Sequence, residues 1–316
     1  MAGQKTATDG IPTALVLSLF FVSGATALVY EVVWSRILMH VFGSTAVALG
    51  TVLAAFMAGM AIGSWLIGKA ADKSSNCLRL YAFLELGLGL AALGSHILLS
   101  HIGPVHLVLH DIFGFSPAVF GVVRFLLAFS LVMAPTVLMG ATLPVLARFL
   151  MNRRNKVGIN LSTLYATNTI GAVSGVLITG FYLIGTFGVH VPVFIAVVAN
   201  ILIGFIAWLV SLRIGDTRFA DPVLTSLPDT TQSGSEGSVD PLISRVILLG
   251  LGISGFTSFA YEIYWTRALI LVVGNSTYAF VTILSAFLTG IALGGWSVHS
   301  CPAATKGRGF KRSRTG

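Results

Sequence analysis

Charged residues are scarce in this chain. Only 9% of its 316 residues are Asp, Glu, Lys or Arg, and 55% are hydrophobic. Soluble globular proteins contain about 25% charged residues, which cover their apolar interior with a polar surface. The composition therefore excludes a soluble enzyme, a disordered chain and a nucleic-acid-binding module, despite a net charge of +8.

The sequence also has few cysteines and no recognisable catalytic motif. The two cysteines, Cys77 and Cys301, cannot form a disulfide framework. No Ser-His-Asp, Cys-His or paired-carboxylate arrangement stands out, and no Gly-x-Gly-x-x-Gly sequence follows a predicted strand. The sequence thus predicts no catalytic residue, no cofactor and no metal for this chain.

Long runs without charge make up most of the sequence. A membrane-spanning helix needs about 20 apolar residues. Helices are favoured over barrel strands because the runs do not alternate between polar and apolar residues. We therefore predict an all-α membrane protein with about eight transmembrane helices. The predicted spans are 13–34, 44–68, 78–100, 119–150, 160–184, 189–212, 243–268 and 275–297.

Basic residues mark every second connection between these spans. Lys and Arg occur in the N-terminus, in the second, fourth and sixth connections and in the C-terminal tail. The odd connections hold Arg36 or Arg267 alone, or no basic residue. Since positively charged loops stay on the cytoplasmic side, we expect a multi-pass protein of the cell (inner) membrane with both termini in the cytoplasm. Both cysteines would then be free thiols on the reducing side.

The sequence contains an internal repeat. Residues 23–65 align with residues 254–296 without a gap, and 19 of the 43 aligned pairs are identical. The core of the repeat is Tyr-Glu-x-x-Trp-x-Arg, at 30–36 and again at 261–267. Helices 1 and 2 thus correspond to helices 7 and 8, in the same orientation. A parallel repeat of this kind is typical of the two halves of a major facilitator transporter.

The repeat divides the chain into parts. We predict a cytoplasmic N-terminus at 1–12, a first six-helix half at 13–212, a cytoplasmic linker at 213–242, the first two helices of a second half at 243–297 and a basic cytoplasmic tail at 298–316. The linker is rich in Asp, Ser, Thr, Pro and Gly, as flexible segments are. The loop at 68–73 is similar to the Gly-x-x-x-Asp-Arg/Lys motif that major facilitators carry between helices 2 and 3. The predicted fold is major-facilitator-like with an incomplete second half.

Several motifs together resemble the integral-membrane region of the bacterial fused transporter/spermidine-synthase-like family. They are the repeated Tyr-Glu-x-x-Trp-x-Arg and the segments 84–87, 139–144, 165–172 and 180–181, with Gly175. The resemblance covers most of residues 13–296. In that family an aminopropyltransferase-like domain with a Gly-rich nucleotide loop follows the membrane region. The resemblance therefore implies such a soluble domain as a partner encoded downstream.

The sequence departs from this family after residue 296. The tail at 297–316 holds five Lys or Arg residues and no acid, where the family pattern would continue with further helices. We expect a truncation or a frameshift near residue 297, before the aminopropyltransferase domain. The alternative is a short natural form whose polybasic tail contacts anionic lipid.

Charged residues of the repeat are candidate site residues. Glu31 and Glu262 lie within spans, where an uncompensated charge costs about 2.5–3.5 kcal/mol on insertion scales. They either line a solute site or form structural ion pairs. A spacing of five residues puts Glu31 and Arg36 about 140° apart on one helix. The ion pairs expected are therefore Glu31 with Arg267 and Glu262 with Arg36.

Two further residues are candidates for solute binding. Glu85 in the third span is the best single candidate for a cation or proton site, and its alternative role is a structural hydrogen bond. Asn168 lies in the Gly-rich fifth span, where small residues favour close helix packing over binding. We expect a membrane domain that transports or senses a small cationic solute such as a polyamine. The alternative is a membrane anchor of an aminopropyltransferase, whose chemistry this chain cannot perform alone.

Overall fold

The computed structural model describes residues 13–101, 111, 116–154, 157–214 and 241–300. Within these residues all regular secondary structure is helical. The helical segments are α1 (Thr13–Phe42), α2 (Thr45–Lys73), α3 (Cys77–Ser100), α5 (Pro117–Arg154), α6 (Val157–Ile178), the π-helical turn η2 (Thr179–Leu183), α7 (Ile184–Phe187), α8 (His190–Ile214), α9 (Pro241–Val273) and α10 (Ser276–Ser300). Eight helical stretches are long and apolar enough to cross a membrane. This confirms the predicted all-α architecture with eight potential spans.

Several helices extend further than predicted, and two of them, α1 and α9, include an arginine that was placed in a connection. The predicted spans end at 34 and 268, but α1 continues to Phe42 and α9 to Val273. Both helices stop at a glycine with positive φ, Gly43 at 65° and Gly274 at 71°, a conformation that other residues adopt only at a cost. Arg36 and Arg267 therefore lie inside helices, and their placement in connections was wrong.

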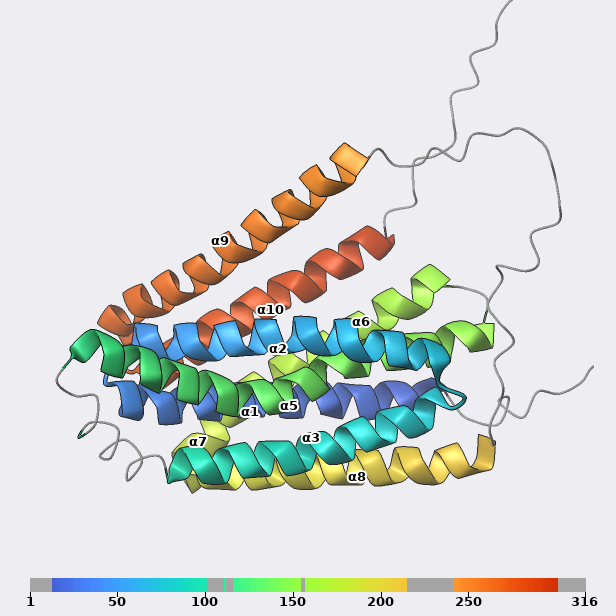
Figure 1. Ribbon diagram of the computed structural model, residues 1–316, viewed down its shortest axis with the longest axis horizontal. Helices are drawn as coiled ribbons and strands as arrows, with labels where there is room; N and C mark the ends of the chain where they lie inside the picture. Colours follow the sequence, from blue (N-terminus) through green and yellow to red (C-terminus); the bar gives the residue numbers. More distant parts are fainter. Residues whose placement is uncertain (1–12, 102–110, 112–115, 155–156, 215–240, 301–316) are drawn as a thin grey trace, which may run out of the picture.

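Successive helices run in opposite directions and pack side by side in a bundle (Figure 1). The ends of α2, α5 and α8 and the starts of α3 and α6 lie toward the right-hand end of the view, and α9 starts above the bundle on the same side. The connections rich in Lys and Arg join helices at this end. α1 and α9 run in the same direction, as expected of a parallel repeat.

The sequence repeat is also a structural repeat. In the first copy the Gly43 amide donates to the Met39 carbonyl, and in the second copy the Gly274 amide donates to the Ile270 carbonyl. These four residues occupy equivalent positions in the alignment. The helix–turn–helix of α1 and α2 thus recurs as that of α9 and α10.

Glycines allow the helices of the first half to pack closely. Gly59 and Gly63 of α2 lie against α5, so closely that a Cβ on Gly63 would collide with the carbonyl of Val137. Gly171 and Gly175 of α6 lie against the backbone of α1 in the same way. Close backbone approach through small residues is the usual means of helix association in membranes.

We expect Gly63→Ala to lower the heat stability of the detergent-solubilised protein, because overpacking a tight contact costs about 1–3 kcal/mol. Gly94→Ala is the matched control, since a Cβ at Gly94 meets nothing within 4 Å. Alanine favours a helix over glycine by about 1 kcal/mol, so the control should be neutral or stabilising. Equal aggregation temperatures for the two variants would contradict the tight contact between α2 and α5.

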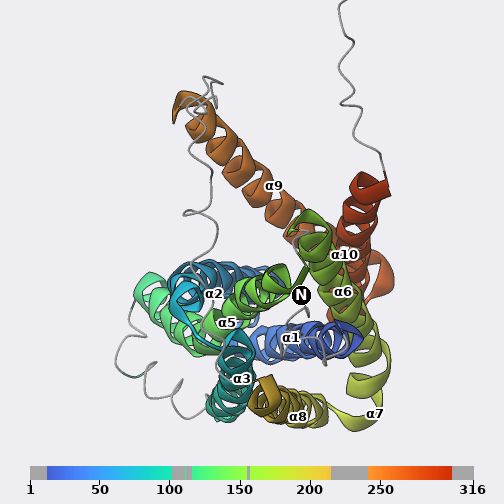
Figure 2. The same ribbon diagram turned by 90° about the vertical axis from the view of Figure 1, so that its right-hand side faces the viewer.

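The second copy of the repeat is unevenly packed. α10 lies against α6 and against α1, where its Phe280, Val281 and Leu284 join a buried apolar cluster. α9 contacts α10 and α2 among the described helices and otherwise extends away from the bundle (Figure 2). In the most apolar stretch of 18 residues in α9, no residue is buried by the rest of the protein.

Candidate functional site

The two repeated acids come together where the copies of the repeat meet. Glu31 on α1 and Glu262 on α9 are 5% and 4% exposed, and their carboxylates are close enough to interact electrostatically. Each is followed four residues later by a hydroxyl, Ser35 or Thr266, and both hydroxyl residues are fully buried. Residues four apart share one face of a helix. We call Glu31, Ser35, Glu262 and Thr266 the repeat-interface cluster.

Several polar atoms of the repeat-interface cluster are buried without a partner. Glu262 Oε1, Ser35 Oγ and Thr266 Oγ1 form no hydrogen bond with any described residue. A buried donor or acceptor left unpaired costs about 1–3 kcal/mol. Such atoms are rare in folded proteins, and each requires an explanation such as a ligand or a water.

The expected ion pairs between the copies are not formed among the described residues, so that prediction was wrong. Arg36 donates from Nη1 to Thr277 Oγ1 over 2.6 Å, and Arg267 is exposed on α9. The position equivalent to Thr277 in the first copy is Ala46, which offers Arg267 no hydroxyl. Neither arginine forms an ion pair with Glu31 or Glu262 among the described residues.

Apolar residues beside the acids also meet their own equivalents. Val32 and Leu49 of the first copy lie in one buried cluster with Phe280 of the second copy, and Ile263 packs against it. Val32 is equivalent to Ile263, and Leu49 to Phe280. Equivalent apolar residues of the two copies therefore share one buried cluster.

Glu85 lies in a different environment, inside the first half. Ser23 Oγ donates to its Oε1 over 2.6 Å, and Asn200 Nδ2 donates to its Oε2 over 2.7 Å. The hydroxyl of Tyr30 donates to Asn200 Oδ1 over 2.8 Å. This network joins α1, α3 and α8, and all four side chains are buried. Its geometry is that of a structural hydrogen-bond network, the alternative role for Glu85.

Asn168 lies at the close contact between α1 and α6. A Cβ on Gly24 would collide with the Asn168 carbonyl, and it would also approach the side-chain oxygen Oδ1 at 2.7 Å. The side chain is half-buried. Asn168 thus belongs to the helix packing that the small residues of this span predicted, and the described contacts do not bring it to the repeat-interface cluster.

A histidine pair in the first half was not anticipated from the sequence. His96 Nε2 of α3 lies 3.0 Å from His190 Nδ1 of α8, and the two rings meet edge to face. The described residues contain no group of three or more His, Cys, Asp or Glu side chains arranged to hold a metal ion. Two histidines alone do not complete a metal site.

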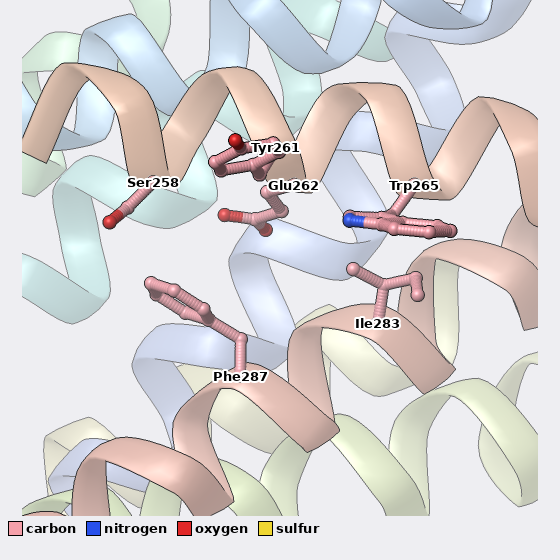
Figure 3. Close-up of a pocket in the computed structure, with 6 residues that line it drawn as sticks. All are labelled: Ser258, Tyr261, Glu262, Trp265, Ile283 and Phe287. Carbon is pink, nitrogen blue, oxygen red and sulfur yellow. The ribbon is translucent and has the colours of Figure 1, made fainter.

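Glu262 also borders an open pocket between α9 and α10. Its volume is about 500 Å³, and it is lined by Ser258, Tyr261, Glu262, Trp265, Ile283 and Phe287. Figure 3 shows the Glu262 carboxylate directed from α9 into the space above Phe287, while Trp265 lies above Ile283. The lining is mostly apolar, with the carboxylate as its charged group.

Comparison with family models, with curated proteins and with solved structures finds no match for the chain. The repeat-interface cluster contains two carboxylates and two hydroxyls, all buried and able to accept hydrogen bonds. That chemistry suits a cation that carries hydrogen-bond donors.

Proposed function

We propose that the chain is a major-facilitator-like membrane domain that binds a small cationic solute between the two copies of its repeat. The observation that carries this proposal is that Glu31 and Glu262 are two buried acids within electrostatic range of each other, with no basic partner among the described residues. Two neighbouring carboxylates repel each other unless a proton or a cation compensates them. A cation held between them would stabilise both.

The hydroxyls define the kind of cation further. Ser35 and Thr266 add neutral acceptors one helical turn from each acid. An ammonium group has several N–H donors and no acceptor, so it satisfies such a set of oxygens. Together with the resemblance to spermidine-synthase-like fusion proteins, this favours an organic ammonium solute such as a polyamine.

The position of the cluster also supports transport or sensing. Solute sites of secondary transporters typically lie near the middle of the membrane, where the internal repeats meet. Glu31 and Glu262 lie at equivalent positions of α1 and α9, the first helices of the two copies. Movement of one copy against the other would change the surroundings of a solute held there.

Spermidine binding to the full chain in lipid nanodiscs tests the proposal. We expect saturable binding that putrescine competes with and that a neutral diol of similar length does not. Asp111→Asn is the matched control, because Asp111 is an exposed acid that is not part of the cluster, and it should bind spermidine like the wild type. Absence of saturable binding would instead favour the membrane-anchor alternative, with an aminopropyltransferase-like partner domain.

The orientation in the membrane is part of the same proposal. The basic residues of alternate connections favour cytoplasmic termini in the inner membrane. Reporter fusions at positions 113 and 188 should give external signals, and fusions at 155 and 233 should give cytoplasmic signals. An external signal at 233 would contradict the arrangement in two parallel halves.

A further inference from the structure

The core of the first copy of the repeat is covered by three other helices. Tyr30, Trp34 and Phe56 are exposed by 2% or less. Tyr30 stacks on Trp34 with ring centroids 5.3 Å apart, and Trp34 meets Phe56 at 6.0 Å. These rings belong to one buried cluster with apolar residues of α3, α5 and α8.

The equivalent aromatic residues of the second copy are not covered by other helices. Tyr261 and Trp265 are 59% and 55% exposed, and with Phe287 they line the pocket between α9 and α10 (Figure 3). They are equivalent to Tyr30, Trp34 and Phe56. Most of the pocket lining therefore corresponds to residues of a filled core in the first copy.

Glycines of the two copies show the same difference. Gly59 and Gly63 of α2 receive the backbone of α5, with Thr136 and Val137 as the nearest neighbours. At the equivalent glycines of α10, Gly290 and Gly294, an added Cβ would meet no described atom within 4 Å. The groove that admits a helix backbone in the first copy is thus repeated on α10.

The hydroxyl groups of the repeat indicate which polar side chains a helix packed on the second copy would present. In the first copy Ser23 donates to Glu85 of α3, and Tyr30 donates to Asn200 of α8. The equivalent hydroxyls, on Ser254 and Tyr261, belong to exposed residues of α9. Lipid chains offer no acceptor to a hydroxyl within the membrane. An acid and a carboxamide at this level would satisfy the two hydroxyls as Glu85 and Asn200 do in the first copy.

We propose that the open face of α9 and α10 is a docking surface for membrane helices of a partner polypeptide that present a carboxylic acid and a carboxamide. A further helix of the same partner packs its backbone on Gly290 and Gly294. A second copy of this chain is not the occupant, because its helices with this chemistry, α3, α5 and α8, already pack on its own α1 and α2. The docking surface borders the proposed cation site at Glu262, but a crosslinking test of docking does not depend on cation binding.

Photo-crosslinking in the membranes of the organism that makes the chain tests the docking surface. The photoreactive residue benzoylphenylalanine is placed at Trp265, and as a control at Leu90, a 64% exposed residue of α3. We expect the probe at 265 to attach to an apolar peptide of another polypeptide that contains Asp or Glu, or Asn or Gln, and the probe at 90 to attach to lipid. Attachment at 265 to lipid, to a second copy, or to a helix without such residues would overturn the proposal.

Removal of the two hydroxyls separates polar recognition from simple proximity. Ser254→Ala combined with Tyr261→Phe should lower the crosslinking yield at 265 by about fivefold or more, since two hydrogen bonds are lost. Thr257→Ala is the matched control on the same helix, because the Thr257 hydroxyl donates to the carbonyl of Ile253, and its yield should not change. A double variant that crosslinks as well as this control would overturn the proposed chemistry of the partner.

Discussion

Glu85→Leu is expected to remove most of the folded protein. The substitution leaves the donors of Ser23 and Asn200 buried without their acceptor, and each orphaned donor costs about 1–3 kcal/mol. Asn200 also accepts a hydrogen bond from the Tyr30 hydroxyl, which joins α8 to α1. Without Glu85 to hold the Asn200 side chain, this second hydrogen bond is weakened as well. The monodisperse fraction on size-exclusion chromatography measures the effect.

Two further variants show whether hydrogen bonding explains the loss. Glu85→Gln keeps an acceptor oxygen for one of the two donors, so its folded fraction should lie between those of Glu85→Leu and the wild type. Phe83→Leu changes a 57% exposed residue of the same helix, and it should behave like the wild type. If Glu85→Leu were as monodisperse as Phe83→Leu, the network would not hold α1, α3 and α8 together.

Neutralising either acid of the repeat-interface cluster is expected to abolish most of the affinity for spermidine. A hydrogen bond to a charged group contributes about 1.5–3 kcal/mol, so Glu31→Gln and Glu262→Gln should each weaken binding by roughly tenfold or more. Neither variant should lower the folded yield, because each removes one of two repelling charges. Equilibrium dialysis with the protein in nanodiscs measures the affinity.

The stability of the same variants distinguishes a solute site from a structural ion pair. Removing one partner of a buried ion pair costs about 3–5 kcal/mol, so a pair between Glu31 and Arg267 would make Glu31→Gln fold poorly. The exchange of Glu31→Arg with Arg267→Glu would then restore part of the yield. A stable Glu31→Gln variant that no longer binds spermidine agrees with the cluster as a solute site.

Most of the fold could be predicted from the sequence because its signals are local or repeated. Long uncharged runs predicted the eight helices, and the ungapped alignment of 23–65 with 254–296 predicted the structural repeat. The predicted end of α1 was wrong because an arginine that ends an uncharged run resembles the start of a connection. In the structure Arg36 lies within the helix and reaches Thr277 of α10, a contact that no local pattern of the sequence contains.

The candidate site could be predicted only in part. Repetition identified Glu31 and Glu262, but their partners depend on how α1 and α9 are turned about their axes, which residue spacing does not determine. Ser35 and Thr266 were missed, although a hydroxyl follows each acid by four residues in both copies. Asn200 was also missed. It is the carboxamide of an otherwise apolar span, and a buried group of this kind requires a polar partner.

Thiol crosslinking in the membrane tests most directly whether Glu31 and Glu262 lie close together between the two copies of the repeat. The full chain, with Cys77 and Cys301 replaced by Ala, carries either Glu31→Cys with Glu262→Cys or Glu31→Cys with Arg267→Cys. A short bifunctional thiol reagent should link positions 31 and 262 readily and leave 31 and 267 unlinked. Linkage of 31 to 267 without linkage of 31 to 262 would contradict the paired acids and restore the ion pair between the copies.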